Sequence, residues 1–133
     1  MKKFLFVSLF TTALLAGCAG GIPSSAKVAP DMPTRASDGV LIGPNGRTIY
    51  TFAKDSANAG TSACYAQCAQ NWPPLTAAAT AKATGDYSII TRTDGARQWA
   101  FKGQPLYYFA KDTKPGDKVG DGALNGAWKV IKP

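Results

Sequence analysis

The sequence predicts a mainly β protein, a small antiparallel-sheet domain of two related, pseudo-symmetric motif repeats with at most one or two short helices. Three observations support this fold class. Turn signals such as Asn45-Gly46 and Asp94-Gly95 separate short runs of β-branched and aromatic residues. The composition disfavours long helices, because the chain holds 14 Gly and 9 Pro and all its acidic residues are Asp. Two ten-residue segments, 46–55 and 103–112, are also related and share six identical residues at matching positions.

The first 37 residues are interpreted as a processing signal followed by a tether. Two lysines precede an apolar run that ends in Leu15-Ala16-Gly17-Cys18, which resembles the lipobox of bacterial lipoproteins. The apolar run is too short to span a bilayer, which needs about 20 residues. We therefore expect a lipoprotein signal peptide at 1–17 and acylation of Cys18. The stretch 18–37 is rich in Gly, Ala, Ser and Pro, which predicts a flexible, lipid-anchored tether.

The residue after Cys18 and the net charge predict where the mature protein lies. Ala19 stands where the enteric sorting rule places Asp for retention at the inner membrane. We therefore expect a lipid-anchored location in the cell envelope, at the outer membrane if the source is Gram-negative. Loss of two lysines with the signal peptide lowers the formal net charge from +7 to +5, which still favours contact with anionic headgroups. No run of basic residues exceeds two, so a nucleic-acid partner is disfavoured.

A β-rich repeat domain is expected over 38–133. Turn signals and β-forming runs predict strands over 40–42, 48–53, 87–93, 97–101, 105–110 and 128–131. A short helix is expected over 62–71, and Trp72-Pro73-Pro74 ends it because the residue before a proline avoids the α region. The Ala-rich stretch 76–84 stays ambiguous between helix and loop.

The two copies of the repeat read GRTIYTFAKD and GQPLYYFAKD, 57 residues apart. Residues two apart on a strand share a face, so the Tyr and Phe of each copy point the same way. The Asp three residues later falls where the strand ends, where a carboxylate accepts N–H bonds of the next turn or a tyrosine hydroxyl. We interpret this motif as structural rather than as a binding site. Its residues are Tyr50, Phe52 and Asp55 in the first copy and Tyr107, Phe109 and Asp112 in the second.

These segments resemble a known family motif. Together with the stretches 64–74, 91–98 and 114–128, they resemble the repeated Yx(F/W/Y)xxD pattern of a bacterial lipoprotein family called the secreted repeat of unknown function. The resemblance covers nearly all of 39–131. It implies a secreted or lipid-anchored envelope protein and brings no established activity with it.

Cys64 and Cys68 are expected to form a structural disulfide, because the envelope is oxidising. Their four-residue spacing would place them one helical turn apart, within the Cα separation that a disulfide tolerates. The alternative is a redox-active pair. It is less favoured because the spacing is CxxxC and the three intervening residues include no His or Lys to lower a thiol pKa.

The sequence predicts no catalytic residue, cofactor or metal site, and the protein is not expected to be an enzyme. It holds no His, which removes the commonest general base and metal ligand. Asp112, Asp117 and Asp121 lie in one Gly-rich loop but do not follow the EF-hand order.

The functional hypothesis is a non-enzymatic envelope lipoprotein that acts as a structural module or binds an envelope protein or glycan. Tryptophan and tyrosine suit either partner when exposed, and the sequence does not decide how many of Trp72, Trp99 and Trp128 are in the core. The alternative is an accessory role in envelope thiol-redox chemistry or electron transfer.

Overall fold

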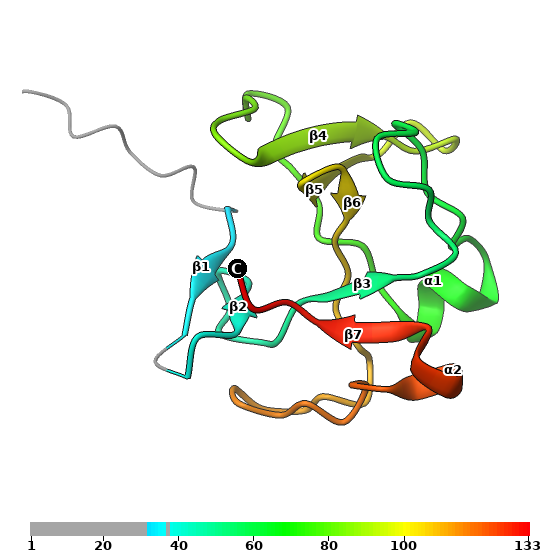
Figure 1. Cartoon of the computed structure of the whole chain (residues 1–133). Coiled ribbons are helices and arrows are strands. Elements are labelled where there is room, and N and C mark those ends of the chain that lie inside the picture. Colours follow the sequence, from blue (N-terminus) through cyan, green and yellow to red (C-terminus); the bar gives the residue numbers. More distant parts are fainter. Residues whose placement is uncertain (1–31, 37) are drawn as a thin grey trace, which may run out of the picture.

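The computed structural model describes residues 32–36 and 38–133 (Figure 1). The predicted signal peptide, Cys18 and most of the predicted tether therefore lie outside the described residues. The strands are β1 (Thr34–Arg35), β2 (Leu41–Ile42), β3 (Tyr50–Phe52), β4 (Tyr87–Thr91), β5 (Arg97–Phe101), β6 (Gln104–Pro105) and β7 (Trp128–Val130), and the helices are α1 (Gln67–Asn71) and α2 (Ala123–Gly126). The prediction of a mainly β domain with two short helices is confirmed.

The strands form three small antiparallel sheets, ordered β1-β2, β3-β7 and β4-β5-β6. The β4–β5 hairpin turns at the predicted Asp94-Gly95, where Gly95 adopts a φ of 86° and Asp94 Oδ1 accepts the N–H of Ala96. The third strand of this meander is shorter than predicted. Only Gln104–Pro105 pair with β5, because the chain then leaves this sheet and Tyr107 forms bridges with Tyr50 and Pro74 instead.

Regular pairing begins earlier than the predicted domain boundary at residue 38. Thr34 and Arg35 of β1 pair with Ile42 and Leu41 of β2, inside the stretch predicted to be an unstructured tether. Met32 also packs against the core. A two-residue strand is held by backbone hydrogen bonds, so it leaves no hydrophobic pattern in the sequence.

The first helix is shorter than the predicted 62–71. Ala66 has a φ of 50°, which is outside the helical region, and α1 begins only at Gln67. Ser62 and Cys64 precede the helix and are buried. The helix ends before Trp72-Pro73-Pro74, as the proline signal predicts.

Two hydrophobic clusters form the core, and β3 separates them. Ile49 belongs to one cluster and Tyr50 to the other, since neighbouring residues of an extended chain point to opposite sides. The first cluster contains Leu41, Ile49, Leu75, Ala81, Trp99, Phe101 and Leu106, and the second contains Tyr50, Phe52, Cys64, Trp72, Tyr107 and Trp128. All three tryptophans are therefore buried. Over the described ranges, no helix has the length and apolar character needed to cross a membrane.

Candidate functional site

The two copies of the motif meet at the centre of the second cluster. The Tyr50 N–H donates to the Tyr107 carbonyl over 2.8 Å, and the Tyr107 N–H returns the bond to the Tyr50 carbonyl over 3.0 Å. The flanking contacts are also equivalent in the two repeats. Tyr50 pairs with Val130, and Tyr107 bridges to Pro74, which lies 56 residues before Val130 and is its counterpart in the first repeat. This reciprocal pairing relates the two repeats by a pseudo-twofold axis between the tyrosines.

The hydroxyl of each tyrosine is bound by the aspartate of the other repeat. Tyr50 donates to Asp112 Oδ2 and Tyr107 donates to Asp55 Oδ2, both over 2.6 Å. The second oxygen of each carboxylate accepts a backbone N–H, from Ala63 over 2.6 Å at Asp55 Oδ1 and from Val119 over 2.9 Å at Asp112 Oδ1. All four side chains are buried. Each motif aspartate therefore accepts both a backbone N–H and a tyrosine hydroxyl, which the sequence allowed as alternatives. The tyrosine belongs to the other copy of the motif.

Four aromatic rings form a continuous stack, which we call the aromatic column. The ring centroids are 4.2 Å apart for Phe52 and Trp128, 3.8 Å for Trp128 and Trp72, and 4.1 Å for Trp72 and Phe109. The column thus alternates between the repeats. Tyr50 packs against Trp72, and Tyr107 packs against Trp128, in T-shaped contacts with ring centroids 5.4 and 5.1 Å apart.

The buried polar groups of this site have shifted acidities. Burial, reinforced by the neighbouring carboxylates, raises the pKa of the Tyr50 and Tyr107 hydroxyls well above the usual value. Burial also raises the pKa of Asp55, and the hydrogen bonds from Tyr107 and Ala63 offset this only in part. The tyrosines are therefore protonated donors, and the carboxylate of Asp55 holds a proton more readily than an exposed one.

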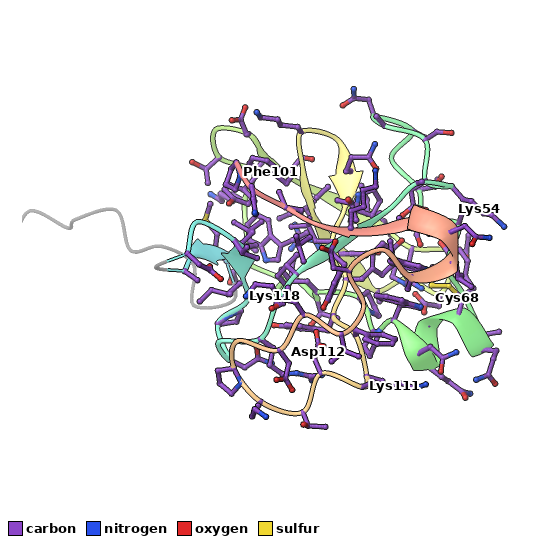
Figure 2. The ribbon with its side chains drawn as sticks, turned by 60° about the horizontal axis from the view of Figure 1, so that its bottom comes forward. Lys54, Cys68, Phe101, Lys111, Asp112 and Lys118 are labelled. Atoms are coloured by element: carbon purple, nitrogen blue, oxygen red, sulfur yellow. A yellow bond between two sulfur atoms is a disulfide. The ribbon has the colours of Figure 1, made fainter. Side chains whose placement is uncertain are left out.

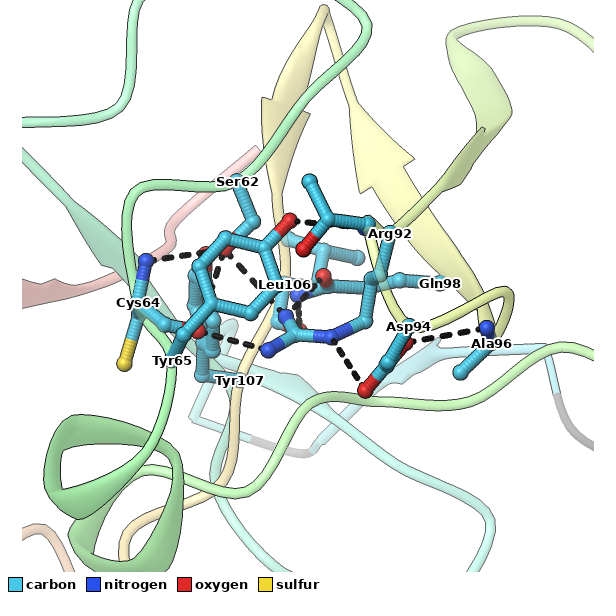
Figure 3. A network of polar contacts seen from close by, with 10 residues as sticks. Ser62, Cys64, Tyr65, Arg92, Asp94, Ala96, Gln98, Leu106 and Tyr107 are labelled. Carbon is cyan, nitrogen blue, oxygen red and sulfur yellow. Dashed lines mark hydrogen bonds and ion pairs between the residues drawn. The ribbon is translucent and has the colours of Figure 1, made fainter.

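A buried arginine connects the two repeats beside Tyr107 (Figure 3). Arg92, only 3% exposed, donates from Nη1 to Gln98 Oε1 over 2.8 Å and to Ser62 Oγ over 3.2 Å, and from Nη2 to the Cys64 carbonyl over 2.6 Å. Ser62 Oγ lies 2.6 Å from the Tyr107 hydroxyl. Sequence reasoning missed Arg92, Ser62 and Gln98 as site residues. The available signal was that Arg92 and Gln98 fall within the run 91–98 that resembles the family.

The structure joins Cys64 and Cys68 in a disulfide, with the Cα atoms 5.2 Å apart. The two residues do not share a helical turn as predicted, because Ala66 between them is left-handed and α1 starts after it. Cys64 is buried in the second cluster and Cys68 packs against it.

The aspartates of the last loop are bound to the protein itself. Asp117 Oδ2 accepts the N–H groups of Thr113 and Lys114, and Asp121 Oδ1 accepts that of Val130. In the part of the chain that the structure describes, no group of three or more His, Cys, Asp or Glu is placed to hold a metal ion.

One surface hollow lies at an end of the aromatic column. Phe52, the terminal ring, lines a hollow of about 290 Å³ together with Ala53, Ala127 and Lys129. At the other end, Phe109 is half-buried. Both ends of the column therefore reach toward the surface, while its two tryptophans are enclosed.

A family model described as a secreted repeat of unknown function matches this chain twice, over residues 34–76 and 88–132. The matched segments correspond to the two copies related by the pseudo-twofold axis. Searches of curated proteins and of solved structures found no match. Because the two segments together span well over half of the chain, the protein belongs to this family of secreted repeats of unknown function.

Proposed function

We propose that the protein is a lipid-anchored, non-enzymatic module of the bacterial cell envelope whose surface binds the anionic headgroup layer of a membrane. The proposal rests on the observation that the motif residues are buried and that their polar groups already have hydrogen-bond partners inside the fold. Each motif aspartate is buried and already bound to a tyrosine and a backbone N–H. A ligand must therefore be met by the surface loops rather than by the motif.

The surface carries an excess of positive charge. All eight lysines among the described residues are exposed. Two of the aspartates, Asp55 and Asp112, are buried, and Asp38 and Asp117 lie within 4 Å of lysine ammonium groups. Exposed lysines attract anionic headgroups over about one Debye length.

Exposed aliphatic side chains occur in the last part of the chain. Val119 is 63% exposed and Leu124 is 69% exposed. Leu124 lies close to two of the lysines. Its carbonyl accepts the N–H of Ala127, and the Ala127 carbonyl accepts the N–H of Ala53, next to Lys54, while Lys129 pairs with Thr51. We call this surface the lysine-rimmed end: Lys54, Leu124 and Lys129. Figure 2 labels Lys54, on the side of α2, and Lys118, which lies across the molecule from it.

Its chemistry suits an interface between headgroups and acyl chains. Aliphatic side chains enter the apolar boundary while lysines contact anionic headgroups. Leu124 also has a φ of 51°, an uncommon conformation for a residue other than glycine, and its side chain is exposed all the same. A contact of one aliphatic residue and two lysines is weak by itself. An acyl anchor at Cys18 would hold the domain at high effective concentration near the bilayer, so a weak contact suffices.

Vesicle flotation tests the proposal with mature protein carrying Cys18→Ser, which removes the anchor. We expect binding to vesicles that contain anionic lipid, no binding to zwitterionic vesicles, and weakening as salt rises. Lys54→Gln with Lys129→Gln should reduce binding, whereas the matched pair Lys82→Gln with Lys102→Gln, outside the lysine-rimmed end, should not reduce it as much. Equal loss in both pairs, or retention on isolated cell-wall glycan in place of vesicles, would contradict the proposal.

The anchor needs its own test, by intact-mass spectrometry of the native protein. The expected mass is that of residues 18–133 plus acyl chains. An unprocessed chain, or a mature mass without lipid, would refute the anchored location.

A second candidate function is the accessory role in envelope electron transfer, and the aromatic column favours it. Two stacked tryptophans and two tyrosines hydrogen-bonded to carboxylates are oxidisable groups held in contact.

A further inference from the structure

We propose that the two Tyr–Asp pairs and the stacked Trp72 and Trp128 form a site that takes up single oxidising equivalents from radicals and holds them as a buried tyrosyl radical. The proposal deepens the second candidate function, electron transfer, and is independent of the membrane contact. It assigns an activity to residues whose other role is to hold the core together.

The first support is the proton acceptor at each tyrosine. A tyrosine that loses an electron must also lose its phenolic proton, since the oxidised phenol is a strong acid. Asp112 Oδ2 and Asp55 Oδ2 lie 2.6 Å from the hydroxyls of Tyr50 and Tyr107, so the proton moves along an existing hydrogen bond. The Tyr65 hydroxyl differs, because it accepts a hydrogen bond from the Thr93 N–H.

The second support is the path for the electron. Trp72 and Trp128 overlap face to face, with centroids 3.8 Å apart and 3° between their planes, so a missing electron is shared between two indoles. Tyr50 contacts Trp72 and Tyr107 contacts Trp128. Trp72 is itself only 5% exposed and lies beneath the half-buried Phe109, so an oxidant at the surface is one ring away.

The step balances for any one-electron oxidant, and an organic peroxyl radical is the chemical class considered for this site. The peroxyl radical takes one electron from the indole pair and leaves as the peroxide anion. Tyr107 returns an electron to the indole while its phenolic proton passes to Asp55 Oδ2. The products are the peroxide anion, a neutral tyrosyl radical and a protonated Asp55. Tyr50 and Asp112 offer the same step by pseudo-symmetry.

The surroundings favour Tyr107 as the residue that holds the radical. Burial raises the pKa of Asp55, so this carboxyl retains the transferred proton. Ser62 Oγ lies 2.6 Å from the Tyr107 oxygen, while its own oxygen receives hydrogen bonds from Arg92 Nη1 and the Cys64 N–H. Ser62 therefore donates to the phenol oxygen and continues to do so after the proton has left. The ring is fully buried, which keeps the radical from coupling with a second protein.

Photochemical oxidation of the mature Cys18→Ser protein tests the proposal. A ruthenium polypyridyl complex with persulfate supplies the one-electron oxidant, and electron paramagnetic resonance and transient absorption detect tyrosyl radicals. We expect a long-lived tyrosyl signal that is lost in the Tyr50→Phe/Tyr107→Phe double variant and unchanged in the matched Tyr65→Phe variant. Near-UV circular dichroism verifies that each variant retains its fold.

A second variant separates proton transfer from packing. Asp55→Asn retains the shape of the side chain and removes the proton acceptor, so the radical at Tyr107 should form more slowly while the fold persists. An equal signal in the double variant and the native protein, rapid cross-linking through dityrosine, or an unchanged rate in Asp55→Asn with Asp112→Asn would each overturn the proposal. These measurements contain no membrane, so their failure leaves the vesicle-binding result intact, and the reverse also holds.

Discussion

The two repeats place the same groups around the pseudo-twofold axis, yet they close their loops differently. In the first repeat, Cys64 and Cys68 form a disulfide. In the second, the positions 56 residues later are Gly120 and Leu124. A Cβ atom on Gly120 would lie 2.6 Å from the Trp72 ring, so a cysteine has no room there. The difference teaches that the axis fixes the aromatic and acidic residues, whereas each loop is free to acquire its own chemistry.

The largest expected effect is on stability, and it should differ between the two motif phenylalanines. Phe52 is 5% exposed and lies on β3, whereas Phe109 is half-buried and lies outside a strand. We expect Phe52→Ala to lower the free energy of unfolding by about 3–5 kcal/mol, and Phe109→Ala to lower it by less. Denaturant unfolding of the two variants measures the difference. Equal costs would contradict the expected difference between the two phenylalanines.

The motif aspartates come next. Replacing either by Asn leaves one oxygen to accept a hydrogen bond and turns an N–H₂ toward another donor. We expect Asp55→Asn and Asp112→Asn each to cost roughly 1–3 kcal/mol. At Asp55 part of this cost is offset, because burial raises the pKa of Asp55 and so penalises the charge that the substitution removes. Unchanged melting temperatures in both variants would refute the structural role of the motif.

Reduction of the disulfide should affect only the first repeat. A loop this short contributes about 2 kcal/mol by the chain-entropy estimate. We expect a modest fall in melting temperature, with loss of hydrogen-exchange protection around α1 and little change around α2. Thiol titration of freshly isolated protein provides the companion measurement. Two free thiols, or a strongly oxidising potential, would instead favour the thiol-redox alternative.

The smallest effect is a pH dependence that belongs to Asp55. Because its folded pKa is raised, the folded state binds a proton that the unfolded chain does not bind between the ordinary value of 3.8 and the raised value. The resulting stability is present at the acidic end of this window and is lost as the pH rises through the raised pKa. We therefore expect the free energy of unfolding of the native protein to fall relative to Asp55→Asn across this window.

This comparison with the variant isolates Asp55 from other carboxyls. Asp38 and Asp117 have lowered pKa values, so they lose their stabilising interactions as the pH falls, which is the opposite trend. Both are present in the native protein and in the variant and cancel in the difference. A difference that stays constant with pH would mean that Asp55 titrates normally.

Local features were predictable from the sequence, and relations between the repeats were not. Asn45-Gly46 and Asp94-Gly95 mark hairpins because a turn depends on the few residues that form it. The periodicity of the motif predicted that Tyr50 and Phe52 share a buried face, and they do. By contrast, the sequence alone does not show that Tyr50 binds Asp112 rather than Asp55. In each copy the aspartate follows the tyrosine by the same number of residues, so the spacing does not distinguish the two pairings.

Two further features also depend on contacts between distant segments. The strand after Gly103 is short because Tyr107 finds partners in β3 and at Pro74, far away in the chain. Arg92 directly follows β4 and is charged, so the sequence alone suggests a surface residue. In the fold, Ser62, Gln98 and the Cys64 carbonyl surround its guanidinium. The role of such a residue can be recognised only in the folded protein, where the two repeats pack against each other.

The exchanged Tyr–Asp bonds have a consequence for the ancestry of the chain. In a polypeptide with one repeat, the phenol and the carboxylate would lack the partners that the other copy supplies here, and pairing with an identical polypeptide would restore both bonds. The present domain has the internal arrangement of such a homodimer joined end to end by the segment 77–87. Gene duplication and fusion would then have freed one loop to gain a disulfide and the other to gain lysines. Separate expression of the two halves, followed by mixing, would show whether they still recognise each other as subunits.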